Sequence, residues 1–293
     1  MKLVWQSKLV LLVVLPFAAA SVVLQTHWWA VNSAPVAIWT VGLSLLLGLM
    51  VFQMRAATPG AAFAGAVITA SLMFSTAAFP YQPWQTALIP VLAVFVLSFI
   101  ATRLGWEQKE RLGTAERRQG RTASQVVANL GVAALVSDEL VQSWLADTGW
   151  FSRAGLAPLP LLTVGLAALA EAAADTVSSE VGQVLGGRPR MMTTLCQVEP
   201  GTDGAISLAG TLAGAAAAGI VAAAGCLALR GGTTMLAVSW AAGVFGLFFD
   251  SLLGATLERR GWLNNDAVNF LSTASAAAFA LGLMAAWPHL GLG

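Results

Sequence analysis

Residues 157–182 read APLPLLTVGLAALAEAAADTVSSEVG, a run of small and apolar residues that contains three carboxylates. An α-helix needs about 20 such residues to cross a hydrocarbon layer about 30 Å thick. Charged groups at membrane depth are costly, so they tend to pair, bind ions or serve a function. The stretch therefore predicts a membrane-spanning helix that carries part of a functional site.

The composition of the whole chain is also that of a membrane protein. Of its 293 residues, 57% are hydrophobic and only 10% are charged, which lies outside the range of soluble globular domains. Besides residues 157–180, the apolar runs of spanning length are residues 9–25, 34–54, 58–79, 84–103, 124–146, 204–229, 233–257 and 266–286. The sequence therefore predicts an all-α, polytopic transmembrane helix bundle of about nine spans.

The first run has a second interpretation. Lys2 and Lys8 accompany a short apolar stretch that ends in small residues, a pattern that also fits a cleavable signal peptide over residues 1–20. In either case the remaining chain stays in the membrane.

The basic residues predict the orientation of the bundle. With the N-terminus in the cytoplasm, every Lys and Arg except Arg153 and Arg230 falls in an inner loop or end, as the positive-inside rule requires. The longest polar segments, near residues 103–123 and 182–204, then become cytoplasmic loops. We expect a multi-pass protein of the inner cell membrane, with its site facing the cytoplasm.

Polar side chains recur near the cytoplasmic ends of four predicted spans. Glu171, Asp175 and Ser179 share one helix face, because residues four apart lie on the same side. Glu180, nine positions after Glu171, points about 180° away from it at about 100° per residue. Other spans bring Asn129, Asp250, Ser251 and Asn269 to a similar depth. This convergence predicts a site at the inner leaflet.

The two loops add basic residues and a tight turn. Residues 102–125 hold six basic against three acidic residues, so they form either a solvated connector or a phosphate-binding surface. In the turn PGTDG, Thr202 or Asp203 is expected to cap a helix that begins near Ala205, and the free N–H groups of that helix suit a phosphate. The candidate phosphate and nucleotide ligands are Lys109, Arg117, Arg118, Arg121, Asn129, Ser179, Arg188, Arg190, Gly201, Thr202, Asp203, Gly204, Ser251 and Asn269.

The types of residue present limit the chemistry. His27 and His289 fall at the opposite membrane boundary, so neither a histidine-ligated zinc site nor a histidine-based nucleophile is expected. The chain has no P-loop or kinase glycine-loop motif, which excludes the soluble nucleotide-binding folds. Oxygen-only ligands select Mg²⁺. The expected metal ligands are Asp175, Glu180 and Asp250, and the expected catalytic carboxylates are Glu171, Asp175 and Asp250.

Three long blocks of the chain carry a family resemblance. They are TRLGWEQKERLGTAERRQGRTASQVVANLG (102–131), EAAADTVSSEVGQVLGGRPRMMTTLCQVEPGTDGAISLAGTLAG (171–214), and DSLLGATLERRG followed by NNDAVNFLST (250–273). In this order they resemble a widespread integral membrane family that contains the phytyl-phosphate kinases of tocopherol synthesis. The resemblance begins near residue 55, which divides the chain into an N-terminal two-span segment (1–54) and a family membrane domain (55–293).

The resemblance implies an enzyme that phosphorylates a prenyl monophosphate, such as phytyl or geranylgeranyl phosphate, to the diphosphate. It implies a nucleoside triphosphate donor, CTP or ATP, and CTP is favoured because related lipid-alcohol kinases use it. The expected partners are a lipid phosphate and membrane lipids, and no nucleic acid. Two alternatives use similar residues: a cytidylyltransferase that forms a CDP-lipid, and an ion-coupled transporter that keeps carboxylates in membrane helices.

Overall fold

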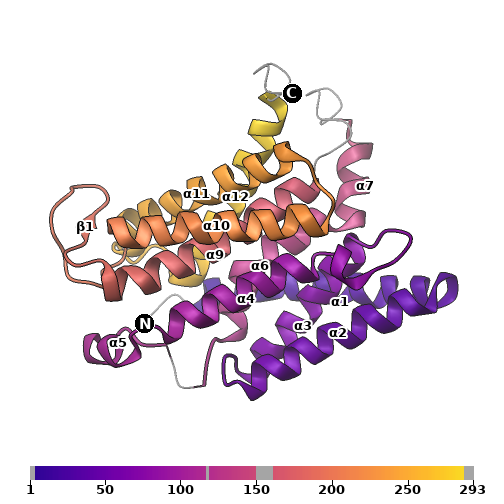
Figure 1. The fold of residues 1–293 in the computed structure, drawn as a ribbon, viewed down its shortest axis with the longest axis horizontal. Helices are drawn as coiled ribbons and strands as arrows, with labels where there is room; N and C mark the ends of the chain where they lie inside the picture. Colours follow the sequence, from indigo (N-terminus) through magenta and orange to yellow (C-terminus); the bar gives the residue numbers. More distant parts are fainter. Residues whose placement is uncertain (1–3, 117–118, 150–160, 287–293) are drawn as a thin grey trace.

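The computed structural model describes residues 4–116, 119–149 and 161–286, and the regular secondary structure of this part of the chain is almost all helical (Figure 1). The helices are α1 (Val4–Asn32), α2 (Ala34–Gln53), α3 (Pro59–Ser75), α4 (Leu88–Arg103), α5 (Trp106–Leu112), α6 (Ala123–Ser137), α7 (Glu139–Asp147), α9 (Leu161–Leu185), α10 (Leu208–Ala228), α11 (Thr233–Leu253) and α12 (Asn265–Ala286). A 3₁₀ turn, η1 (Pro83–Gln85), precedes α4, and a π-helical turn, η2 (Gly254–Glu258), continues α11. Two short strands, β1 (Arg190–Met191) and β2 (Ala205–Ile206), pair antiparallel before α10. The all-α prediction is confirmed.

Six helices are long and apolar enough to cross a membrane: α1, α2, α9, α10, α11 with η2, and α12. The helices α4 and α5 make a seventh span if their 67° bend lies within one crossing. By contrast, α3 and α6 are apolar but have only 17 and 15 residues. At about 1.5 Å per residue, α6 is about 22 Å long, which is short of a hydrocarbon layer of about 30 Å. The multi-pass prediction is confirmed, whereas the described helices support six or seven spans rather than nine.

The predicted span over residues 124–146 is wrong, because the helix breaks at Asp138. The backbone of Asp138 is extended (φ −69°, ψ 133°), so α6 ends there and α7 leaves in a new direction (Figure 1). One carboxylate oxygen of Asp138 accepts a hydrogen bond from the Leu140 amide at 2.9 Å, and the other accepts one from Ser21 of α1. The two hydrogen bonds satisfy both oxygens of this buried carboxylate, which caps α7. Hydropathy does not indicate such a cap.

The helix α9 lies at the centre of the bundle and packs against α4, α6, α10, α11 and α12. Within its most apolar 18-residue window, 83% of the residues are buried. Small side chains permit this close packing: at Gly243 of α11, an added Cβ would lie 2.9 Å from the Cβ of Ala170. Neighbours on several sides therefore fix the depth at which α9 holds its carboxylates.

Near its start, α1 is bonded to the segment before α12. The side-chain amide of Gln6 donates to the Trp262 carbonyl oxygen at 2.8 Å, and its oxygen accepts from the Asn264 amide at 2.8 Å. The helix α1 thus packs as part of the bundle. This agrees with the prediction that residues 9–25 form a span.

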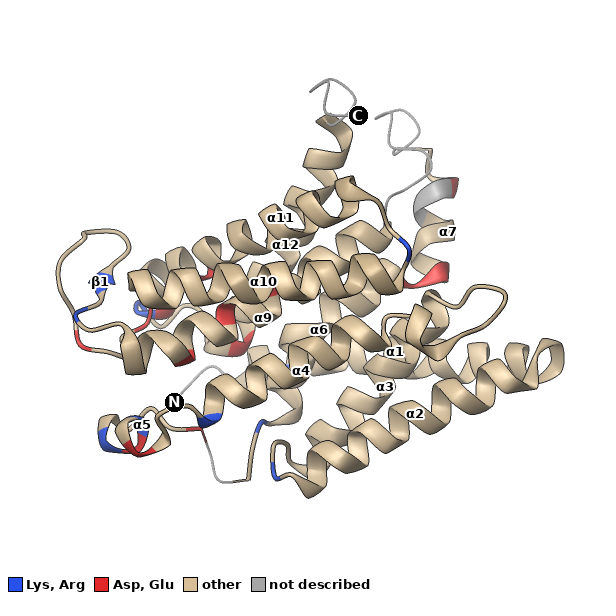
Figure 2. Ribbon diagram, in the orientation of Figure 1, with Lys and Arg blue, Asp and Glu red and all other residues tan. Residues whose placement is uncertain are grey.

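Charged residues gather at one end of the bundle (Figure 2), where α4, α9 and α11 end and α3, α6, α10 and α12 begin. We call this the polar end. The loops predicted near residues 103–123 and 182–204 both lie there. Polar residues that are far apart in the sequence therefore meet at this end.

Candidate functional site

A cavity of about 260 Å³ lies at the polar end between α6, α9, α11 and α12, and the two polar loops complete its wall. We call it the polar cavity. Many of the predicted site residues line it: Arg121, Asn129, Asp175, Ser179, Glu180, Gly201, Thr202, Asp203, Gly204, Asp250, Ser251 and Asn269. The convergence expected from the spacing of these residues is therefore present in the fold.

Asp175 of α9 and Asp250 of α11 meet at the polar cavity, close enough for their carboxyl groups to interact directly. Oδ2 of Asp250 is buried and has no hydrogen-bond partner among the described residues. Glu171 is not in the cavity wall, because it lies one turn deeper on α9, where it is 1% exposed. Of the three predicted catalytic carboxylates, two therefore reach the cavity.

These donors fit a divalent cation that is held in part by a substrate. Mg²⁺ prefers oxygen and in phosphate-transfer sites typically uses one or two carboxylates plus substrate phosphates. Oδ2 of Asp250 is an orphaned buried acceptor that such an ion would satisfy. Within the described ranges, no three His, Cys, Asp or Glu side chains are grouped to hold a metal ion by themselves. Asp175 and Asp250 are the donors that fit such an ion directly, and the inclusion of Glu180 as a third ligand stays a prediction.

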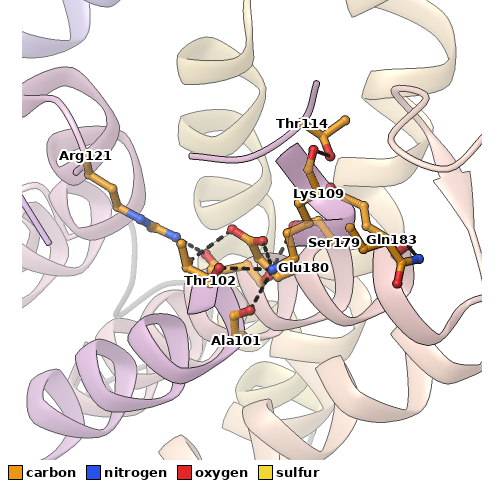
Figure 3. Close-up of polar contacts among 10 residues, drawn as sticks. Ala101, Thr102, Lys109, Thr114, Arg121, Ser179, Glu180 and Gln183 are labelled. Carbon is orange, nitrogen blue, oxygen red and sulfur yellow. Dashed lines mark hydrogen bonds and ion pairs between the residues drawn. The ribbon is translucent and has the colours of Figure 1, made fainter. Parts of the chain in front are cut away.

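Lys109 and Glu180 form a buried ion pair between α5 and α9 (Figure 3). The Lys109 ammonium donates to Glu180 Oε2 at 2.6 Å and to the carbonyl oxygens of Ala101 and Thr102 at 2.8 and 3.1 Å. Thr102 Oγ1 donates to the other carboxylate oxygen of Glu180 at 3.0 Å. Because an ammonium has three N–H donors, all those of Lys109 are used. This geometry does not support the predicted phosphate contact by Lys109, and it gives Glu180 a cationic partner other than a metal.

Arg121 stands in the wall of the polar cavity, directly before α6. Its guanidinium donates to Thr176 Oγ1 at 3.4 Å. Its backbone is fixed against the start of α3, since its N–H donates to the Ala56 carbonyl and its own carbonyl accepts from the Thr58 amide, both at 3.0 Å. Gly120 permits this approach: its φ is +78°, and a Cβ there would lie 2.2 Å from the Ala56 carbonyl carbon. Arg121 is thus held in place by its backbone.

Two other predicted basic residues, Arg188 and Arg190, do not line the polar cavity. Arg188 and Arg190 are exposed near the β1–β2 pair, and Arg190 donates to the Leu195 carbonyl oxygen at 2.9 Å. Arg117 and Arg118 lie outside the described residues. Within the described part of the chain, Arg121 is the one predicted basic residue in the polar cavity wall.

The predicted turn at residues 200–204 is present, but the helix after it starts later than expected. The cap of α10 is Ser207, whose Oγ accepts from the Gly210 amide at 3.1 Å, so the predicted cap by Thr202 or Asp203 is wrong. Gly204 (φ +74°) lies so close to η2 that an added Cβ would be 2.2 Å from the Ala255 nitrogen. The turn therefore sits against the π-helical segment that follows Asp250, and such segments are frequent at functional sites.

Several polar residues of this wall were not among the predicted site residues, and Glu116, Thr176 and Glu258 are three of them. Thr176 directly follows Asp175 in α9. Glu258 comes eight residues after Asp250 and lies in the π-helical turn η2, so α-helical periodicity would not have placed both on one face. Glu116 lies in a loop, where no such periodicity exists.

An apolar groove of about 570 Å³ adjoins the polar cavity and is lined by α2, α3, α4 and α6. Its wall consists mainly of apolar side chains, among them Leu47, Val94 and Phe95. Glu116, Arg121 and Asn129 border both the groove and the polar cavity. An apolar and a polar compartment therefore meet at these three side chains.

Comparisons with known proteins agree with the membrane architecture. Residues 42–277 match the family model described as Integral membrane protein DUF92. The chain is 35% identical to an uncharacterized membrane protein of Methanocaldococcus jannaschii (64% of this chain, 71% of that protein). It is 34% identical to an uncharacterized membrane protein of Synechocystis sp. (69% and 75%) and 32% identical to the chloroplastic protein VTE6 of Arabidopsis thaliana (65% and 56%). No solved structure matches the chain significantly.

Proposed function

Because the chain belongs to the DUF92 family of integral membrane proteins, we propose that it is a membrane-embedded prenyl-phosphate kinase. It would transfer a phosphoryl group from a nucleoside triphosphate, with CTP favoured over ATP, to a prenyl monophosphate such as phytyl or geranylgeranyl phosphate. The activity comes from the resemblance of three sequence blocks to the family of the phytyl-phosphate kinases. The observation that carries it is the polar cavity, where Asp175, Asp250 and Arg121 meet.

The reaction suits a site without histidine. A prenyl monophosphate is already an anionic nucleophile near neutral pH, because the second pKa of a phosphomonoester is about 6. One of its oxygens attacks the γ-phosphorus of the donor, and the bond to the β–γ bridging oxygen breaks, with its electron pair leaving on the nucleoside diphosphate. No general base is needed, so catalysis reduces to neutralising charge and holding two polyanions in line.

The residues of the polar cavity divide these tasks. Asp175 and Asp250 would hold Mg²⁺, which when bound neutralises the charge of the phosphates. Arg121 would contact a phosphate through its planar guanidinium. The backbone N–H groups of the turn at residues 201–204 would bind part of the nucleotide. We also propose that the polar end faces the cytoplasm, where the positive-inside rule puts it and where nucleotides are available.

Transfer of differently labelled nucleotides tests the proposal. Purified protein is incubated with Mg²⁺, geranylgeranyl phosphate, and CTP or ATP labelled at either the α- or the γ-phosphate. The kinase puts γ-label into a lipid diphosphate. Entry of α-label into the lipid would instead show a CDP-lipid-forming cytidylyltransferase, and no labelled lipid with either donor and several chain lengths would overturn the proposal.

Variants then test the carboxylates. Asp175→Asn and Asp250→Asn should each lower the rate of transfer by about 100-fold or more, because each removes a charge from the cation site. Asp147→Asn is the matched control, since Asp147 is an exposed carboxylate of α7, outside the polar cavity. Near wild-type transfer by both cavity variants would show that the cation site lies elsewhere.

A further inference from the structure

The apolar groove runs from the polar end into the membrane-spanning part of the bundle. On α4 its lining extends from Arg103 to Val91, which at about 1.5 Å per residue is a length of about 18 Å. Its charged residues lie at the mouth, where Arg55, Arg103 and Arg121 outnumber the one acidic residue, Glu116. The groove is therefore cationic at one end and apolar along most of its length.

We infer that this groove holds the isoprenoid tail of the lipid phosphate while the phosphate reaches the polar cavity beside Arg121. The inference rests on the proposed function and adds to it the place of the tail. A ligand with an anionic head and an apolar tail matches the groove in both charge and hydrophobicity. Since Arg121 and Asn129 border both compartments, a head at Arg121 leaves its tail directly at the groove.

Gly65 of α3 is the position at which the groove can be shortened. It lines the groove, and an added Cβ would contact only Cγ1 of Val126, at an ordinary distance of 3.7 Å. A larger side chain there would fit the backbone and occupy space along the groove. Ser98 lies on the wall formed by α4, and its buried hydroxyl has no hydrogen-bond partner among the described residues. A Leu at Ser98 would therefore narrow the groove without breaking a described hydrogen bond.

Selectivity for chain length is the first test. Gly65→Leu should lower kcat/KM for geranylgeranyl phosphate by about tenfold or more and lower that for the shorter geranyl phosphate by clearly less, because more of the longer tail must pass the blocked space. Ser98→Leu should likewise lower the ratio of kcat/KM for geranylgeranyl phosphate to kcat/KM for geranyl phosphate. Gly42→Leu on α2 is the control, since a Cβ at Gly42 meets nothing within 4 Å and Gly42 does not line the groove. Equal losses for both substrates in both groove variants would overturn the inference.

Photo-crosslinking gives a readout that does not need turnover. Geranylgeranyl phosphate with a diazirine at the far end of its tail is added to the protein in phosphatidylglycerol-containing nanodiscs, and labelled peptides are identified by mass spectrometry. We expect labels on α3 near residues 65–69 or on α4 near residues 91–94, and competition by unlabelled geranylgeranyl phosphate. Labels confined to other helices would overturn the inference. It would also be overturned if added phosphatidylglycerol competed as well as geranylgeranyl phosphate does, because the groove would then bind ordinary bilayer lipid.

The two proposals fail in different ways. If the groove is labelled but no phosphoryl group is transferred, the tail site stands and the kinase assignment fails. If transfer occurs and the labels lie elsewhere, the kinase assignment stands and the tail site fails.

Discussion

Replacing Lys109 by Met tests whether this residue holds the fold or binds phosphate. Met keeps most of the apolar length of the side chain and removes the ammonium, which is bonded to Glu180, Ala101 and Thr102. Breaking a buried ion pair by removing one partner costs about 3–5 kcal/mol. The Lys109 side chain is 0% exposed, but that of Glu180 is 12% exposed at the polar end. Water can therefore reach the remaining carboxylate, and we expect a loss near the lower limit, about 3 kcal/mol.

The assay is a double-mutant cycle. The free energy of unfolding is measured in mixed detergent micelles by tryptophan fluorescence for wild type, Lys109→Met, Glu180→Gln and the double variant. The double variant should be more stable than the sum of the single losses predicts, by about 1–3 kcal/mol, because it leaves no unpaired charge behind.

Two results would refute this reasoning. Losses that add within about 0.5 kcal/mol would show that the two side chains do not interact in solution. If Lys109→Met has wild-type stability but a higher KM for the nucleotide, then Lys109 binds phosphate, as its place in a basic loop suggests. If the ion pair is structural, KM for the nucleotide should remain within about twofold, because the folded variant keeps its cavity wall.

Three further predictions concern the polar cavity. Arg121→Gln should lower kcat/KM by about 100-fold, because it removes a charged contact to phosphate. The control Arg190→Gln, at an exposed residue, should change kcat/KM little. Equal effects of the two variants would show that Arg121 does not bind the phosphate. Gly113→Ala should lower the free energy of unfolding by about 1 kcal/mol, because Gly113 has a positive φ. In the same unfolding assay Gly120→Ala should lower it by about 1–3 kcal/mol more, because its Cβ also collides with Ala56. Equal losses would show that the backbones of Gly120 and Ala56 do not approach closely. Chelation by EDTA should abolish transfer and added Mg²⁺ should restore it, and transfer that persists in EDTA would exclude the cation site.

The helices were predictable because the bilayer restricts the backbone. A chain in hydrocarbon must satisfy its N–H and C=O groups internally, so a long apolar run forms a helix. Most predicted runs coincide with one helix each. The break at Asp138 was not predictable from hydropathy, which does not register that this carboxylate caps α7 and accepts a hydrogen bond from Ser21, 117 residues away in the sequence. The number of crossings also required the structure, since apolar runs do not show where a helix stops short.

The candidate site was predictable to the extent that helix periodicity and loop position determine it. The shared depth of Asp175, Asp250, Asn129 and Asn269 followed from the ends of their spans, and all four line the polar cavity. The sequence did not predict which of the basic residues lie in the cavity wall. Lys109 lies in a basic loop by sequence, yet its ammonium is directed at a carboxylate 71 residues away.

The helix α6 borders both compartments, since its residue Asn129 lines the polar cavity and the apolar groove. Its first turn is fixed by a reciprocal cap in which Thr122 and Gln125 bond each other's backbone N–H groups, and this cap follows Arg121 directly. One turn further on, Asn129 accepts a hydrogen bond from Asn269 of α12 at 3.1 Å. The same turns that border the apolar groove are thereby bonded to α12, which forms another part of the polar cavity wall. Under the proposed function, a lipid phosphate seated at this junction would need only its head to leave the apolar phase.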